Sequence, residues 1–98
     1  MTQQYLVTFH IDQPVDGIFT SKIPHQRLIV DQLLQSGKML MYSLTKDMST
    51  LYIVFQVEST EQLGTLIDTL PLSEYMTWDY QELFFHLSTV VLPEISLN

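Results

Sequence analysis

The order of two kinds of hydrophobic periodicity along the chain is the feature that most constrains its fold. Four segments are rich in β-branched and aromatic residues or alternate apolar with polar residues, as strands do, and two segments repeat their apolar residues with a helical period. The expected strands cover residues 4–11, 38–47, 49–58 and 77–88, and the expected helices cover residues 19–35 and 60–70. The sequence therefore predicts the order β-α-β-β-α-β with short connections.

This order is typical of the α+β, ferredoxin-like class, in which a four-stranded antiparallel sheet carries two helices on one face. A chain of 98 residues has room for one core, so we expect residues 1–98 to form a single domain. The second face of the sheet must also be covered, and two such faces that meet would form a dimeric α+β barrel. We therefore expect a homo-oligomer that is at least a dimer.

Local signals mark the ends of the two expected helices. Asp16 begins a turn or caps the first helix, and Gly37 is suited to the left-handed position just after its end. Ser59 and Gln62 form a capping-box pattern before the second helix. Pro71 ends that helix, because the residue before a proline is pushed out of the α region.

Composition excludes several classes of partner and site. The net charge is −7 and only four residues are Lys or Arg, which argues against nucleic acid or an anionic membrane as a partner. The hydrophobic content of 46% is high for such a short chain, and we expect the apolar tail, residues 90–98, to lie on a partner subunit. The absence of cysteine excludes disulfides, thiolate zinc sites and a cysteine nucleophile.

Cofactor and targeting signals are also missing from the sequence. The three histidines show no i,i+4 pair and there is no glycine-rich phosphate loop, so we expect no metal and no cofactor. The first ten residues have no basic segment followed by an apolar run, and no window is as long and apolar as a membrane span. We expect a cytoplasmic protein without a signal peptide.

The polar residues of the first helix are the first candidates for a site. Placed at 100° per residue, Gln26 falls near the middle of the apolar face, Arg27 falls on its flank and His25 points away. Arg27 either binds an anion or forms a salt bridge with an acid such as Asp12 or Asp31. Gln26 either orients a ligand or has its amide satisfied by the backbone.

The strands supply the other candidates. His10 lies at the end of the first strand, near the start of the first helix, where it could act with Arg27; His86 lies at the end of the last strand. Each histidine is either a general base or a structural residue at a strand end. The expected last strand places Trp78, Tyr80, Phe84 and His86 on one face, and its aromatic residues line either the core or a ligand site.

Several segments together resemble muconolactone isomerase and its relatives. These are "YLVTFHIDQP", "QSGKM", "LYIVFQVESTEQL", "LIDTLPLSEYM" and "ELFFH" followed by serine, which span nearly the whole chain. The most specific is "LPL-x-x-YM", which resembles the family's connection from the second helix to the last strand. The resemblance implies a dimeric α+β barrel, often assembled into larger rings. It also implies a cofactor-free reaction that moves a C=C bond in an unsaturated lactone by proton abstraction next to a carbonyl.

The resemblance is uneven at the residues that would carry this reaction. His86 matches the family's histidine after the last strand. In the family the first helix carries a dense run of Arg, Lys and Glu, whereas here only Arg27 is basic and the inward position holds the neutral Gln26. Thr8 and His10 stand where the family has a lysine and an aspartate.

Three functions are compatible with these residues. The first is an isomerase acting on a small lactone or carbonyl compound, in which Arg27 stabilises negative charge and His10 or His86 moves the proton. Its substrate-binding residues would be Gln26, His25, Trp78 and Tyr80. The second is a non-catalytic oligomeric module that binds a small ligand and has lost the family's charged residues. The third is a cofactor-free oxygenase of the kind also found on this barrel.

Overall fold

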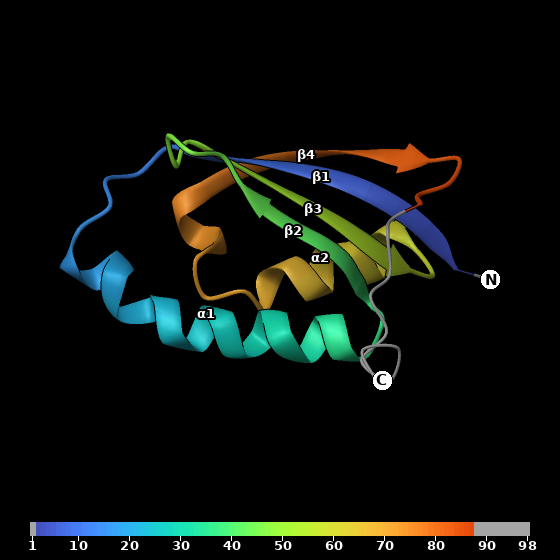
Figure 1. Cartoon of the computed structure of the whole chain (residues 1–98), viewed down its shortest axis with the longest axis horizontal. Coiled ribbons are helices and arrows are strands. Elements are labelled where there is room, and N and C mark those ends of the chain that lie inside the picture. Colours follow the sequence, from blue (N-terminus) through green and yellow to red (C-terminus); the bar gives the residue numbers. More distant parts are fainter. Residues whose placement is uncertain (1, 88–98) are drawn as a thin grey trace, which may run out of the picture.

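The computed structural model describes residues 2–87, so the expected contact of the tail with a partner subunit lies outside the described residues. The elements follow the predicted order, with one 3-10 turn added before the last strand (Figure 1). They are β1 (Gln3–Ile11), α1 (Gly17–Gln35), β2 (Met39–Leu44), β3 (Thr50–Val57), α2 (Thr60–Asp68), η1 (Ser73–Tyr75) and β4 (Met76–Leu83).

The four strands form one antiparallel sheet in the order β2-β3-β1-β4, and both helices lie on one face of it (Figure 1). The predicted ferredoxin-like α+β fold is therefore confirmed. In the register of the sheet, Phe9 of β1 lies between Leu51 of β3 and Trp78 of β4. Side chains of directly opposed residues lie on the same face, so this register assigns each paired strand residue to the helix face or to the open face.

The core lies between the sheet and the helices. It is made of apolar side chains that alternate along the strands and repeat along the helices, as the sequence periodicity predicts. Its fully buried members include Val7, Phe9, Ile53, Phe55, Leu63 and Ile67. Removing each such aliphatic or aromatic side chain from water stabilises the fold by about 1.5–3 kcal/mol.

Both predicted helix caps are formed. The Asp16 carboxylate accepts a hydrogen bond from the Phe19 N–H at 2.9 Å, which starts α1 two residues before the expected position. The Ser59 hydroxyl accepts from the Gln62 N–H at 3.1 Å, and the Gln62 amide oxygen accepts from the Glu58 N–H at 2.8 Å. The glutamine thus reaches one residue beyond the N-cap, and the capping box satisfies two otherwise unpaired donors.

The last strand is shorter than predicted. It ends at Leu83, which pairs with Gln4, and β1 begins at Gln3, so at most one further residue of β1 could pair with a longer β4. Phe84 and His86 therefore lie outside the strand, and the expectation that they share a face with Trp78 and Tyr80 was wrong. No helix among residues 2–87 is long and apolar enough to cross a membrane.

Candidate functional site

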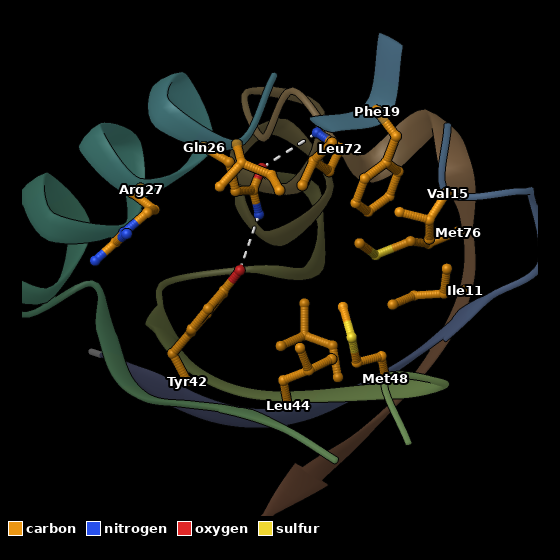
Figure 2. Close-up of a pocket in the computed structure, with 12 residues that line it drawn as sticks. Ile11, Val15, Phe19, Gln26, Arg27, Tyr42, Leu44, Met48, Leu72 and Met76 are labelled. Atoms are coloured by element: carbon orange, nitrogen blue, oxygen red, sulfur yellow. Dashed lines mark hydrogen bonds between the residues drawn. The ribbon is translucent and has the colours of Figure 1, made fainter. Parts of the chain in front are cut away.

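A pocket opens between the first half of α1 and the sheet (Figure 2). It exists because α2 ends at Asp68 and covers only the region beside the second half of α1 (Figure 1). The start of α1 thus has the short η1 beside it instead of α2, and it faces the β2–β3 hairpin across the pocket. The cavity measures about 140 Å³ and nine of its twelve lining side chains are apolar: Ile11, Val15, Phe19, Ile23, Leu44, Met48, Leu51, Leu72 and Met76.

Gln26 is the polar residue at the inner wall of this pocket, and only 2% of it is exposed. Its Oε1 accepts a hydrogen bond from the backbone N–H of Leu72 at 3.1 Å, and its Nε2 donates to the Tyr42 hydroxyl at 3.2 Å (Figure 2). The backbone thus satisfies one half of the amide, and a side chain satisfies the other. Gln26 ties α1 both to the connection after α2 and to β2.

The Leu72 contact also determines how the Tyr42 hydroxyl is used. A backbone N–H can only donate, so the side-chain oxygen of Gln26 must face Leu72 and its NH₂ group must face Tyr42. The Tyr42 oxygen is therefore an acceptor in this contact, and its own proton is available to another partner. Tyr42 lines the pocket and is 36% exposed, so that partner can be a ligand.

Arg27 lies next to Gln26 on α1 and lines the edge of the same pocket (Figure 2). Its side chain is exposed, and it forms no ion pair with Asp12, Asp31 or any other acid of residues 2–87. The ion pair recorded within this range joins Lys22 and Glu74 at 2.8 Å, and this hydrogen bond raises the pKa of Lys22. Of the two roles predicted for Arg27, the salt bridge is not formed among residues 2–87, and anion binding stays a prediction. Figure 2 shows the guanidinium at the edge of the pocket, directed away from the apolar side chains.

The three histidines do not line this pocket. His10 is exposed on the open face of the sheet, opposite Thr50 and Thr77, so the structure does not bring it together with Arg27 on the helix side. His25 is exposed on α1 and is not among the lining residues. His86 lies in a groove on the open face, and its Nε2 is buried without a hydrogen-bond partner among the described residues.

Trp78 and Tyr80 lie on the helix side of the edge strand β4, outside the pocket. They form an aromatic row with residues of β1: the ring centroids of Phe9 and Trp78 are 6.4 Å apart, those of Trp78 and Tyr80 6.1 Å, and those of Tyr5 and Tyr80 5.6 Å. Both residues remain more than one-third exposed, because neither α-helix extends over β4 (Figure 1). The structure places them away from Gln26, with which they were grouped as substrate-binding residues.

Tyr42 and Met48 belong to the pocket although the sequence did not single them out. Met48 has a φ of 63° in the β2–β3 turn, a conformation that favours glycine or asparagine. The turn is fixed by Asp47, whose carboxylate accepts hydrogen bonds from the Ser49 hydroxyl (2.8 Å), the Thr45 hydroxyl (2.8 Å) and the Ser49 N–H (3.0 Å). These bonds lower the pKa of Asp47. The sequence signal that could have indicated Met48 is a large apolar residue directly after an aspartate in a short turn, where a polar residue or glycine is usual.

Comparison with known proteins identifies the fold. No model of a protein family matches the sequence, and no curated protein matches it. Among solved structures, muconolactone isomerase matches with a TM-score of 0.72 and 24% identity over 91% of this chain and 96% of the other. An uncharacterized protein from Thermotoga maritima matches with a TM-score of 0.55 and 10% identity, over 85% of this chain and 99% of the other. The chain therefore has the fold of muconolactone isomerase.

Proposed function

We propose that this chain is a small-molecule-binding domain, and that its pocket takes a compact apolar compound carrying a carboxylate or carbonyl oxygen. The observation that carries the proposal is the pairing of an apolar cavity with two donors that have no acceptor among residues 2–87, the Arg27 guanidinium and the Tyr42 hydroxyl proton. Ligand sites in proteins typically combine apolar walls with a few polar groups.

The size of the cavity limits the apolar part of the ligand. An engineered protein cavity of about 150 Å³ with aliphatic and aromatic walls stays dry and binds benzene. The pocket of about 140 Å³ has the same kind of walls, so it fits a single ring or a short branched chain. A larger ligand would have to extend out of the pocket past its edge.

The polar groups limit the rest of the ligand. Arg27 can only donate, and the oxygen of Tyr42 is already an acceptor for Gln26. The two groups therefore suit an oxygen acceptor on the ligand, and the charge of Arg27 favours an anionic one. Among residues 2–87, no Asp or Glu lines this pocket, so no carboxylate there would repel an anion.

We expect benzoate to bind this pocket more tightly than benzamide, its uncharged isostere, and to lose about fivefold to tenfold in affinity on Arg27→Gln. That factor lies just below the effect of about 1.5–3 kcal/mol of a hydrogen bond to a charged group, because Arg27 is exposed and solvent screens its charge. Titration followed by two-dimensional amide NMR gives both the affinity and the residues that respond. Lys38→Gln removes the same charge away from the pocket and serves as the control. Equal binding of benzoate and benzamide would contradict the proposal.

A second candidate function is isomerisation of a small unsaturated lactone, and the shared fold with muconolactone isomerase favours it. Arg27 and Tyr42 are suited to stabilise the enolate that forms when a proton leaves the carbon next to a carbonyl. The described residues that line the pocket do not supply a base for this reaction, because Gln26 is neutral and no histidine is among them. Proton NMR with muconolactone in deuterated water separates the two roles. Deuterium entry faster than without protein supports an isomerase, whereas binding without exchange supports the binding domain.

We also propose that the open face of the sheet joins two copies of the chain into a dimer. Leu6, Met41, Tyr52 and Val54 lie on this face, and Phe85 lies beside them in the same groove. Further apolar side chains that follow β4 are strongly exposed, with Phe84 at 99% and Leu87 at 83%. An exposed apolar patch of this kind on a sheet face is typical of a surface that binds another protein.

A further inference from the structure

Met48 combines two features that do not stabilise the fold of the isolated chain. Its backbone has a φ of 63°, which is strained for a residue with a Cβ and a long side chain. Its side chain is 52% exposed, so much of its apolar surface remains in water. Glycine or asparagine at this position would relieve the backbone strain and would leave no large apolar side chain in water. The presence of methionine therefore needs an explanation other than the turn itself.

The surroundings of Met48 hold the strained conformation in place. The Met48 N–H donates to the Thr45 carbonyl at 2.9 Å, which closes the turn, and the Thr45 N–H donates to the Thr50 carbonyl at 2.9 Å at its base. Asp47 adds three hydrogen bonds to Thr45 and Ser49. Strained residues persist where neighbouring bonds over-determine them, and they concentrate at binding sites.

The conformation directs the Met48 side chain into the pocket. Figure 2 shows its thioether pointing from the turn toward the cavity, between Leu44 and Ile11 and opposite the wall formed by Phe19. Met48 thus reaches the pocket from the β2–β3 turn, at the end of the cavity away from Arg27. An exposed thioether there would become buried against an apolar ligand, and methionine adapts to the shape of what it contacts.

We propose that Met48 is a specificity-determining residue that closes the apolar end of the pocket over a bound ligand and limits its size. The proposal rests on the pocket being a binding site, as proposed above, but it does not depend on Arg27 or on the charge of the ligand. The strained turn is then the conformation that places the apolar Met48 side chain over the cavity.

The test measures stability and binding in the same variants, with benzene as a compact probe and tert-butylbenzene as a bulky one. In Met48→Asn we expect benzene to bind about fivefold to tenfold more weakly, the factor that follows from losing contact with one or two methylene-sized groups. We expect tert-butylbenzene not to be weakened, so that the preference for benzene falls. The melting temperature should be no lower than in the unmodified protein, because asparagine tolerates a positive φ. Met48→Leu keeps an apolar side chain and should retain benzene binding.

Met48→Gly provides a second variant without any side chain, and it should match Met48→Asn in both measurements. Unchanged benzene affinity in both variants, or failure of benzene to bind the unmodified protein, would overturn the proposal. A lower melting temperature in both variants would also overturn it, because Met48 would then be a structural residue. The comparison of benzoate with benzamide does not enter this test, so failure of the anion preference can be told apart from failure of the role of Met48.

Discussion

Replacement of Gln26 by alanine is expected to destabilise the folded protein by about 2–4 kcal/mol, since it removes a buried side chain together with both of its hydrogen bonds. The change leaves a cavity at a site that is 2% exposed and leaves the buried N–H of Leu72 without its acceptor. Urea unfolding followed by circular dichroism measures the loss. Gln32→Ala makes the same change at an exposed position of the same helix and should stay within about 0.5 kcal/mol of the unmodified protein.

A second substitution separates the hydrogen bonds from the volume of the side chain. Gln26→Leu fills nearly the same space, so its cost of about 1–3 kcal/mol reflects mainly the unpaired Leu72 N–H. Its effect on benzoate binding tests the role of Gln26 in orienting Tyr42, because the Tyr42 hydroxyl loses the donor that now fixes it. If Gln26→Leu were as stable as the unmodified protein and bound benzoate equally well, the contacts of Gln26 would contribute neither to folding nor to the site.

The arrangement of the pocket explains why a neutral amide suits the inward position of α1. A carboxylate there could accept from Leu72, but it would place a negative charge beside the apolar wall and close to Arg27, where we propose that an anion binds. The amide satisfies the same backbone donor and gives the Tyr42 oxygen a donor in return. Gln26 is thus consistent with a pocket arranged for binding an acceptor.

The sequence predicted the order of elements and the helix caps because these depend on local periodicity and on neighbouring residues. Asp16 and Ser59 cap helices through contacts three residues away. The end of β4 depends instead on where β1 begins, which is a property of the sheet. Strand propensity continues well past Leu83, whereas β1 extends only one residue, Gln3, past the residue that pairs with Leu83.

The candidate site was predictable to the extent that one helix carries it. Helical projection placed Gln26 inward and Arg27 beside it, and both line the pocket. Tyr42 could not be found in the same way, because its role follows from the contact between β2 and α1. The prediction that His10 acts with Arg27 rested on the end of β1 lying near the start of α1. The alternation of side chains along β1 places His10 on the face opposite Phe9, and therefore away from the helices.

Tyr52→Glu is expected to weaken self-association by at least about 100-fold, since Tyr52 lies on the open face of the sheet that we propose as the dimer interface. In a two-fold symmetric dimer the substitution occurs twice, so two uncompensated carboxylates would be buried between chains that already carry a net charge of −7 each. Sedimentation equilibrium over a micromolar range measures the shift from dimer to the 11.4 kDa monomer.

Tyr80→Glu is the matched control, because it changes the same residue type at a similar exposure on the opposite side of the same sheet. Tyr52 is 37% exposed and Tyr80 is 45% exposed, so a general effect of the new charge on the sheet should be alike in both variants. Circular dichroism melts of the two variants show whether the fold is retained. Dissociation by Tyr52→Glu but not by Tyr80→Glu would locate the interface on the open face. If the unmodified protein sediments as a monomer, or if only Tyr80→Glu dissociates it, the open face does not join two copies, and the apolar groove at Phe85 must be covered in some other way.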